Sequence, residues 1–324
     1  MNSYLRASVK RVDRQSGAAL ILVLIVASLV SITAVAVSEQ TQLGIYLTQN
    51  FNNSVQANRY LSAAEQRVLL LLKPLTTEPT VNLQQAWAQP SSFPVDRGGI
   101  QISITDMRSC FNLNLIADQV EERAGKGLES EEVSRLRNLL DLDEVNLTDQ
   151  RKLIEQIKDW VDPNSAVSGP YGKEDQSGIG QVVADAPLMG MDDLLLLDIS
   201  ADAKSKITGS TCVLPIGSGN KINVNTLQNP NVLAAYSLGI VDKSTAESIL
   251  LQRPEEGYLS LDDFFSQFAE EDRAKITAMP FGLQSNFFKA DLKVSYGRSV
   301  KQRRIFIRLD SRQAKIYKRV NKDG

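Results

Sequence analysis

Histidine is absent from all 324 residues, and this absence removes several classes of site. A Ser-His-Asp triad, an HExxH zinc site and an imidazole general base all require it. The sequence also lacks a Walker A motif, a Rossmann glycine motif and a nucleophile elbow. Its adjacent acidic pairs, Asp192-Asp193 and Asp262-Asp263, would point in different directions on a helix and are typical of capping or solvated residues. We therefore do not expect an enzyme.

Cysteine is scarce as well, because the chain has only Cys110 and Cys212. The two residues lie too far apart for a CxxC redox or zinc motif. In an oxidising compartment the natural interpretation is a disulfide between them. It would close a loop of roughly 100 residues and stabilise the fold by about 4 to 5 kcal/mol in the chain-entropy model. The alternative is two separately buried thiols.

The net charge of −2 conceals a basic amino terminus. The first 17 residues contain one acidic residue, Asp13, and the four basic residues Arg6, Lys10, Arg11 and Arg14. Without this segment the net charge would be about −5. A chain of that sign is a poor partner for nucleic acid, whose phosphates are bound mainly by Lys and Arg. Hard cations suit it better.

Charge is missing from residues 18–38, which read AALILVLIVASLVSITAVAVS. As a helix this run would be about 30 Å long, the thickness of the hydrocarbon core of a bilayer. Basic residues precede it, whereas Glu39 is the first charge after it and Arg59 is the next cation. The positive-inside rule therefore places residue 1 in the cytoplasm and everything after about residue 38 outside.

The sequence Arg14-Gln15-Ser16-Gly17 before Ala18 resembles the leader of type IV prepilins, which a prepilin peptidase cuts after the glycine. The resemblance implies a leader peptide at residues 1–17, cleavage between Gly17 and Ala18, and N-methylation of Ala18. An ordinary secretory signal has a shorter apolar core and a small-x-small cleavage site. A plain uncleaved signal anchor is the alternative.

A long helix is predicted to continue beyond the membrane, because no Pro or Gly interrupts the chain between Gly44 and Pro74. The apolar residues of this segment share one narrow arc of a 3.6-residue helix; they are Leu43, Leu47, Leu61, Val68 and Leu72. Polar residues interrupt the arc at Asn50, Ser54, Asn58 and Glu65. Residues 18–38 and 39–72 are therefore predicted to form one rod of about 50 residues, roughly 80 Å long.

Pilins and pseudopilins usually carry Glu at mature position five, which is Leu22 in this sequence. Further stretches are FNLN at 111–114, DWVD at 159–162, GKED at 172–175, INVNT at 222–226 and LSLDDF at 259–264. Together with the length and the missing Glu, they resemble the general secretion pathway protein K family, the largest minor pseudopilin of type II secretion. Without the Glu, a subunit cannot neutralise the methylated amine of the subunit above it, which suits the end of a filament.

The periodicity predicts an α+β, pilin-like fold, in which the long N-terminal helix packs on an antiparallel sheet and a large α-helical domain is inserted. Alternation predicts strands at 99–105 and 111–115 in the first part of the body (73–116), and at 287–296, 301–309 and 314–320 in the last part (285–324). The insert (117–284) has helical patterns at 117–124, 130–141, 148–160, 192–198, 226–236, 243–252, 261–268 and 270–277. The resemblance implies the same fold.

An acidic loop, PNSAVSGPYGKED at 163–175, follows the predicted helix that ends near Trp160. Oxygen donors gather around it, as calcium requires; they are Asp159, Asp162, Asn164, Glu174 and Asp175. In the protein K family this loop is associated with bound calcium. Here Asn164 stands where an acid is common, and Gln176-Ser177 replaces the usual aromatic pair. The alternative is that these residues are turn formers and helix caps.

Residues 222–268 include a segment that resembles a helix-hairpin-helix module, a fold that grips DNA phosphates through a Gly-x-Gly turn. The turn here is Leu238-Gly239-Ile240-Val241-Asp242, which lacks the second glycine and adds a negative charge. We interpret the module as scaffold, with Ala246, Ile249 and Leu250 in a helix core. The alternative function is a DNA-binding pseudopilin of a DNA-uptake or type IV pilus machine.

The resemblance implies a structural minor pseudopilin, anchored by a single pass in the inner membrane, with a cytoplasmic amino terminus and a periplasmic body. It would initiate and cap the tip of the pseudopilus that exports folded proteins across the outer membrane. The implied partners are the minor pseudopilins of types H, I and J, the major pseudopilin, the prepilin peptidase, the inner-membrane secretion platform, the secretin and the exported proteins. A membrane-anchored hydrolase that uses calcium is a further alternative.

Overall fold

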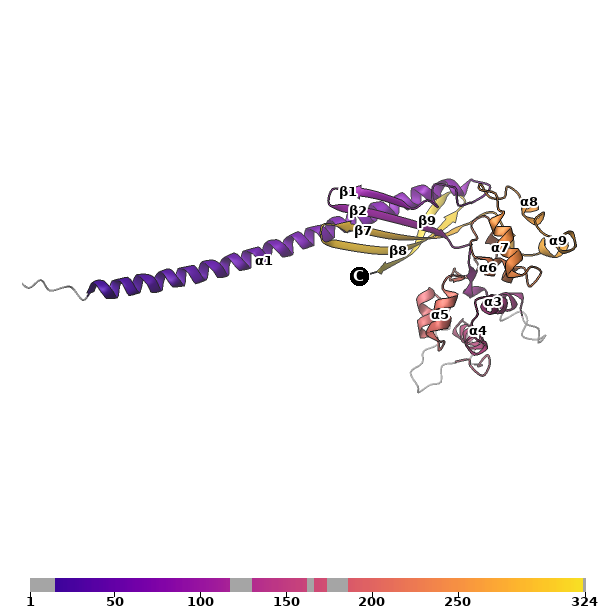
Figure 1. Cartoon of the computed structure of the whole chain (residues 1–324), viewed down its shortest axis with the longest axis horizontal. Helices are drawn as coiled ribbons and strands as arrows, with labels where there is room; N and C mark the ends of the chain where they lie inside the picture. Colours follow the sequence, from indigo (N-terminus) through magenta and orange to yellow (C-terminus); the bar gives the residue numbers. More distant parts are fainter. Residues whose placement is uncertain (1–14, 117–129, 162–165, 174–185, 323–324) are drawn as a thin grey trace, which may run out of the picture.

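One helix, α1 (Gln15–Leu72), forms the rod that the sequence predicts, and it ends where Pro74 begins the short 3₁₀ helix η1 (Lys73–Thr76). The structure, a computed structural model, describes residues 15–116, 130–161, 166–173 and 186–322 (Figure 1). From residue 17 to residue 49 every side chain of α1 is exposed. The last part of the helix buries one face against the sheet through Asn53, Ala57, Leu61, Ala64, Glu65, Val68 and Leu72.

The sheet has five antiparallel strands in the order β1-β2-β7-β8-β9. Their bounds are β1 Ser91–Val95, β2 Gly98–Asp106, β7 Phe287–Tyr296, β8 Ser299–Asp310 and β9 Gln313–Lys322. Alternate residues of β2, β7 and β8, such as Ile102, Leu292 and Ile305, form one core with the buried face of α1. The three carboxy-terminal strands and the strand at 99–105 are thus confirmed.

Two strand predictions need correction. The sequence predicted no strand at β1, which contains Pro94. β1 is an edge strand, and an edge strand tolerates a residue without an N–H group. The strand predicted at 111–115 is wrong. Only β3 (Phe111–Asn112) is extended, it pairs in parallel with β4 (Thr211–Cys212) away from the main sheet, and the chain then turns into the 3₁₀ helix η2 (Leu113–Ile116).

The α-domain, as we call residues 117–284, connects β2 to β7 and has its own hydrophobic core. Its described elements are α3 Glu131–Leu142, α4 Leu147–Val161, η3 Met191–Leu196, α5 Ala201–Ile207, β5 Ile222–Asn223, α6 Pro230–Tyr236, α7 Lys243–Leu251, α8 Leu261–Phe265, α9 Glu270–Ile276 and β6 Phe281–Gly282. The helix predicted at 117–124 lies outside the described residues.

Some boundaries in the α-domain differ from the periodicity. The helix predicted from residue 226 begins only at Pro230, because Asn229 caps it and proline favours the first turn. The helix predicted at 192–198 is the 3₁₀ helix η3, and the short helix α5 was not predicted. Asp193 and Asp263 accept hydrogen bonds from backbone N–H groups at the starts of η3 and α8, as expected for capping residues.

A buried polar junction fixes the α-domain to the end of the sheet. Asp106, the last residue of β2, accepts hydrogen bonds from the hydroxyls of Thr226 and Ser285 and, at 2.8 Å, from the Arg108 backbone N–H. Burial raises the pKa of Asp106, although these hydrogen bonds act in the opposite direction. Because Thr226 and Ser285 come from the α-domain and from the return into β7, Asp106 joins three segments that are distant in sequence.

Arg108 completes this junction from the neighbouring turn. Its guanidinium donates to the Asn286 side chain at 3.0 Å, to the Gly219 carbonyl at 2.9 Å and to the Ser218 carbonyl. Neutral oxygen atoms therefore satisfy a cation that is only 7% exposed. The loop before β5 is held against the root of the sheet in this way.

Cys110 and Cys212 form a disulfide, with their Cα atoms 5.8 Å apart, so the alternative of two free thiols is wrong. The bond closes a segment that contains α3, α4, η3 and α5. Both cysteines pack in a small cluster with Phe287 and Phe306 of the sheet. The first half of the α-domain is thus attached covalently at the same junction.

Glu65 is the charged residue in the buried face of α1, and its side chain is 7% exposed. Its carboxylate accepts hydrogen bonds from Arg303 of β8 at 2.8 Å and from Arg319 of β9 at 3.1 Å. The interruption of the apolar arc is therefore an ionic contact between the rod and two strands.

We expect Glu65→Ala to lower the free energy of unfolding by about 3 kcal/mol, because it leaves Arg303 largely buried without its counter-ion. Urea unfolding of the full chain in detergent would measure this. The matched control is Glu78→Ala, which removes the same charge from an exposed position and should change stability by less than about 0.5 kcal/mol. Equal effects of the two substitutions would show that the buried ion pairs do not stabilise the packing of the rod.

Candidate functional site

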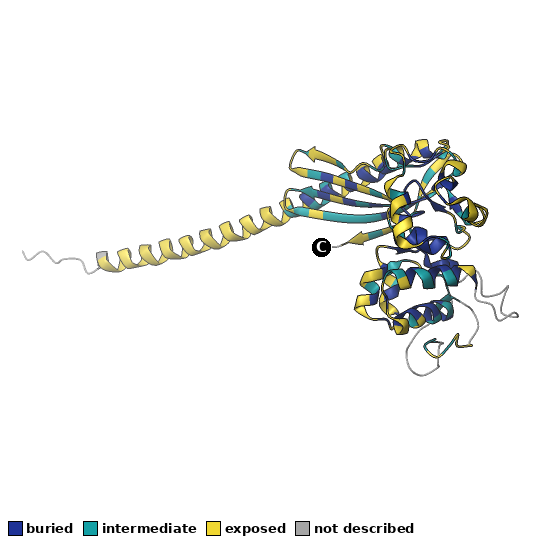
Figure 2. Ribbon diagram, turned by 45° about the vertical axis from the view of Figure 1, so that its right-hand side comes forward, coloured by how far each residue is buried: buried dark blue, intermediate teal, exposed yellow. Residues whose placement is uncertain are grey.

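The rod is the first candidate site, and its apolar surface is open along most of its length (Figure 2). Among the described residues, α1 is the one helix long and apolar enough to span a membrane. Gly17 and Ala18 lie in its first turns, and Leu22 is 66% exposed, so the position that usually carries Glu in pilins presents an apolar side chain. This helix fits a single-pass membrane anchor.

A second apolar stretch of α1 lies between the predicted span and the body. Large apolar side chains remain about half exposed or more there; they are Leu43, Ile45, Tyr46, Leu47 and Phe51. Leu43 and Leu47 belong to the predicted arc, but they precede the part of the helix that the sheet covers. Exposed apolar surface of this kind, outside a lipid environment, is typical of a protein interface. This stretch of α1 therefore offers an apolar surface for contact with another protein.

The α-domain lies at the end of the body that is far from the predicted membrane span (Figure 1). The junction at Asp106 and the disulfide hold it there, beside the ends of β2 and β7. Helices α8 and α9 project beyond the sheet in the direction of the rod, whereas α4 and α5 extend sideways from it (Figure 1). A molecule that approached this end of the body would therefore meet the α-domain first.

The acidic loop meets the carboxyl-terminal half of α4. Asp159 is fully buried, and its Oδ1 atom accepts a hydrogen bond from the Ser168 N–H at 2.8 Å. Its Oδ2 atom has no hydrogen-bond partner in the described part of the chain. Gly172 is required here, because a Cβ atom on it would lie 2.2 Å from this same Oδ2 atom. Asp159 thus directs one unpaired carboxylate oxygen into the loop.

Of the predicted calcium ligands, the structure describes only Asp159; Asp162, Asn164, Glu174 and Asp175 lie outside the described residues. The described residues contain no cluster of three acidic, His or Cys side chains that could hold a metal ion. The chemistry of Asp159 nevertheless fits a hard cation, since a buried carboxylate oxygen needs a partner and calcium prefers oxygen ligands.

Glu155 is a residue of this loop site that the sequence reasoning missed. It lies one turn before Asp159 on α4, and its Oε2 atom accepts a hydrogen bond from the Tyr171 N–H at 2.7 Å. The signal was available, because carboxylates four residues apart share one face of a helix. Glu155 and Asp159 together hold residues 168–171 against α4.

The helix-hairpin-helix segment consists of α6 and α7 joined by a tight turn, in which Leu238 and Gly239 have positive φ angles of 53° and 81°. Asp242 caps α7 by accepting a hydrogen bond from the Thr245 N–H at 2.8 Å, and this bond lowers the pKa of Asp242. Ala246 and Ile249 are buried in the core, and Leu250 is partly buried. A carboxylate occupies the start of α7, where a DNA phosphate would bind, which favours the scaffold interpretation.

Two family models match the chain, and both are described as type II secretion system (T2SS), protein K. One matches residues 109–216 and the other residues 222–282, so together they cover more than half of the 324 residues. These ranges contain the acidic loop, both cysteines and the helix-hairpin-helix segment.

Relatives match along almost the whole chain. Type II secretion system protein K of Aeromonas hydrophila is 29% identical, over 95% of this chain and 97% of the relative. The protein of the same name from Pectobacterium carotovorum is 28% identical, over 95% and 96%.

A solved structure has the same fold. It is a chain in the crystal structure of the GspK-GspI-GspJ complex from the enterotoxigenic Escherichia coli type 2 secretion system, with a TM-score of 0.71 at 23% identity, over 86% of this chain and 99% of that chain. With the long anchor helix, the antiparallel sheet and the inserted helices, these matches show that the chain belongs to the protein K family of minor pseudopilins of the type II secretion system.

Proposed function

We propose that this minor pseudopilin occupies and caps the tip of the periplasmic pseudopilus and helps to initiate its assembly for the export of folded proteins. The observation that carries the proposal is the position of the α-domain at the end of the body farthest from the membrane span (Figure 1). A subunit added above would have to enter the space that the α-domain fills, because packed protein interiors leave no room for overlap. A subunit below meets only the rod and the sheet.

The exposed side chain of Leu22 supports the same position. A carboxylate at this place would be costly within lipid unless it met a cation, and in a pilin the cation is the amine of another subunit. Because Leu22 is uncharged, it avoids the cost of a carboxylate in lipid, and it also lacks the attraction to the amine of another subunit. The chain can therefore insert readily at the start of assembly, and it has no need of a subunit above it.

The partners follow from this position and from the related complex. That crystal structure contains GspI and GspJ together with GspK. We infer that the corresponding minor pseudopilins pack against the exposed apolar residues 43–51 of α1, with the type H subunit and the major pseudopilin following below. The inner-membrane anchor, the periplasmic body, and contacts with the secretion platform, the secretin and the exported proteins belong to the same proposal.

The processing step is also part of the proposal. The leader at residues 1–17 would be removed by the prepilin peptidase after Gly17, and Ala18 would be methylated. Gly17 stands in open surroundings, with no atom within 4 Å of a Cβ built on it. Any effect of a larger side chain there would therefore reflect recognition by the peptidase and not a steric clash within the chain.

The acidic loop is proposed to bind calcium through Asp159 and the carboxylates that flank the loop in sequence. The unpaired Oδ2 atom of Asp159 supports this proposal. A bound cation would neutralise the buried carboxylate and connect α4 to the loop, which would stabilise this side of the α-domain.

Placement can be tested with a label on the α-domain. The described residues include no free cysteine, so Leu259→Cys, at a side chain that is 75% exposed, gives one reactive thiol for maleimide-gold. We expect gold at one end of each isolated pseudopilus, and none on filaments with the unsubstituted chain. Gold along the shaft would contradict the tip position. Leu22→Glu in the labelled chain should leave the gold at the end, because the α-domain still blocks further addition.

Processing is tested by intact mass spectrometry of the chain from membranes with and without the prepilin peptidase. We expect a methylated chain that starts at Ala18 only when the peptidase is present. Gly17→Val should leave the leader attached, whereas Gly44→Val, at a glycine equally free of neighbours, should be processed normally. If the leader remained attached in every sample, α1 would be a plain uncleaved signal anchor, and the proposed processing would be wrong.

Calcium binding is tested by unfolding the full chain in detergent with calcium or with a chelator. At a calcium concentration of 100 times Kd, the free energy of unfolding should rise by about 2.7 kcal/mol. Asp159→Asn should abolish most of this gain while it retains the hydrogen bond from Ser168. Asp202→Asn, which removes an acid with a 68% exposed side chain, is the control. An unchanged calcium effect in Asp159→Asn would exclude this carboxylate as a ligand.

A further inference from the structure

Charge is divided sharply between the two parts of the molecule outside the rod. The α-domain segment, residues 117–284, contains 29 acidic and 15 basic residues, a net charge of −14. Residues 285–324, which contain strands β7, β8 and β9, have 12 basic and 3 acidic residues, a net charge of +9. An overall charge near zero thus combines an acidic domain with a basic sheet.

The basic residues are not spread evenly over the sheet, because its two faces differ. The inner face packs on α1, and there Arg303 and Arg319 are paired with Glu65. In the described part of the chain the outer face carries no helix, and α-domain residues reach it at one end, where Lys318 donates to the Met189 carbonyl at 2.6 Å. The rest of the outer face is open (Figure 1).

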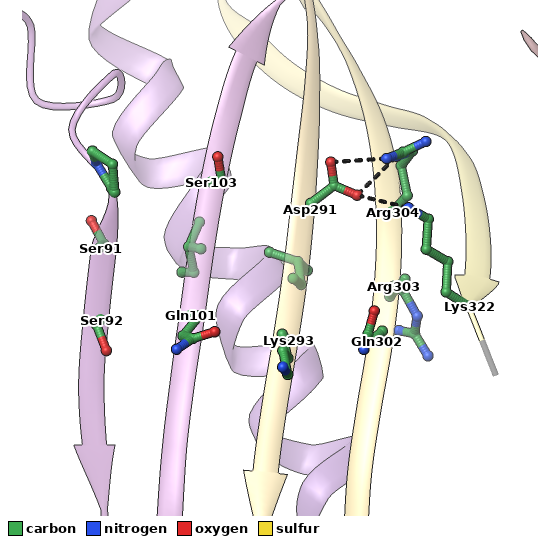
Figure 3. Close-up of a pocket in the computed structure, with 13 residues that line it drawn as sticks. Ser91, Ser92, Gln101, Ser103, Asp291, Lys293, Gln302, Arg303, Arg304 and Lys322 are labelled. Atoms are coloured by element: carbon green, nitrogen blue, oxygen red, sulfur yellow. Dashed lines mark hydrogen bonds and ion pairs between the residues drawn. The ribbon is translucent and has the colours of Figure 1, made fainter. Parts of the chain in front are cut away.

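A groove of about 530 Å³ hollows this open part of the outer face (Figure 3). The register of the five strands explains which residues meet there. Lys293 of β7 lies opposite Gln101 of β2 on one side and Gln302 of β8 on the other, and Gln302 lies opposite Lys322 of β9. Two lysines and two amides therefore form one continuous row across four strands.

The next row contains the single acid of the groove. Asp291 accepts two hydrogen bonds from Arg304, at 2.8 Å and 3.1 Å, and lies 3.5 Å from the Lys322 ammonium. Figure 3 shows both cations turned towards this one carboxylate. Among the described residues Lys293 has no ion-pair partner and is exposed. Asp291 is thus shared by Arg304 and Lys322, and Lys293 is a third cation without an ion-pair partner among the described residues.

Lys289 lies just outside the groove, two residues before Asp291 on the same face, and the pKa of its side chain reflects the excess of positive charge there. Burial lowers the pKa of its ammonium, and the positive charges of Arg304 and Lys322 lower it further, against the opposing effect of Asp291. Like charges so close together repel each other, and an incoming anion would relieve that repulsion.

A polar outer face is ordinary for an antiparallel sheet with one solvated side. Three observations go beyond that ordinary case: the face is hollowed, its cations outnumber the nearby acid, and they lie in a chain whose other globular part is strongly acidic. The groove therefore presents an excess of positive charge to an anion.

We propose that the groove across strands β1, β2, β7, β8 and β9 is a docking site for an acidic segment of another protein that lies beside the body. Lys293 and Lys322 supply the charge, and the amides of Gln101 and Gln302 supply hydrogen bonds between them. The proposal goes beyond the tip function, because it concerns the side of the subunit and does not require a particular place in the filament.

The geometry favours a protein over the bilayer surface as the occupant. The strands run along the direction of α1 (Figure 1), and α1 crosses the membrane, so the outer face stands steeply to the membrane plane. A flat anionic bilayer could touch the end of the sheet but not this groove. An adjacent protein in the periplasm can lie along the whole face.

The test uses the full chain in neutral detergent and a fluorescent 12-residue peptide in which Glu and Ser alternate. We expect the peptide to bind at 50 mM NaCl and to bind severalfold more weakly at 200 mM, as exposed charges are screened. The double variant Lys293→Gln/Lys322→Gln should weaken binding at least tenfold. The control Lys243→Gln/Lys275→Gln removes the same charge from exposed positions on the α-domain and should weaken it less than twofold.

Charge reversal provides the second arm. Lys293→Glu/Lys322→Glu should lose the acidic peptide and bind a peptide in which Lys and Ser alternate, which a misfolded variant would not do. Equal losses in the groove and control variants, or no binding by the unsubstituted chain, would overturn the proposal. It would also be overturned if phosphatidylglycerol vesicles or duplex DNA bound more tightly than the acidic peptide with the same dependence on Lys293 and Lys322.

Discussion

The rest of the structure depends on the packing of the last five turns or so of α1 against the inner face of the sheet. One unbroken helix satisfies its own backbone hydrogen bonds both in lipid and in water, so it can pass from the membrane into the body without an interruption. Its buried face is mostly apolar and includes Glu65, which is bound by arginines of β8 and β9. The last part of the rod and the sheet therefore form one packed unit.

The sheet in turn fixes the α-domain, because the chain leaves it at the end of β2 and returns at the start of β7. Those two ends are adjacent, so a large insertion costs the sheet little and must project from that edge. Asp106, Arg108 and the disulfide then select one orientation. A covalent bond and a buried polar network act together, and a buried network with few unmet hydrogen bonds tolerates little displacement.

Opposite charges are kept apart in this arrangement. The acidic α-domain lies at the distal end, and the basic groove lies along the side of the body, with Asp291 as its one internal counter-ion. Electrostatic complementarity contributes more to the choice of partner and to the rate of encounter than to raw affinity. In our proposal, two surfaces of opposite sign let one subunit discriminate between neighbours at its end and neighbours at its side.

The sequence by itself determined the features that depend on local patterns. A run without charge predicted the membrane span, and the lack of Pro and Gly predicted the continuous rod. Alternation of apolar and polar residues predicted β2 and the three last strands, because it indicates which side of a strand is buried. The family resemblance came from short motifs and from Leu22. The helices predicted at 226–236 and 261–268 were too long, because Asn229 caps the start of α6 at residue 230 and α8 ends at Phe265.

Only the tertiary structure decided how distant segments meet. The parallel pairing of β3 with β4, the disulfide and the three-way junction at Asp106 all join residues far apart in the chain. The four-residue spacing places Glu155 on the same face of α4 as Asp159, but its contact with the Tyr171 N–H exists only because the loop folds back onto α4. Hydrophobic periodicity specifies a face but not its partner, and partners are fixed by the simultaneous packing of the whole chain.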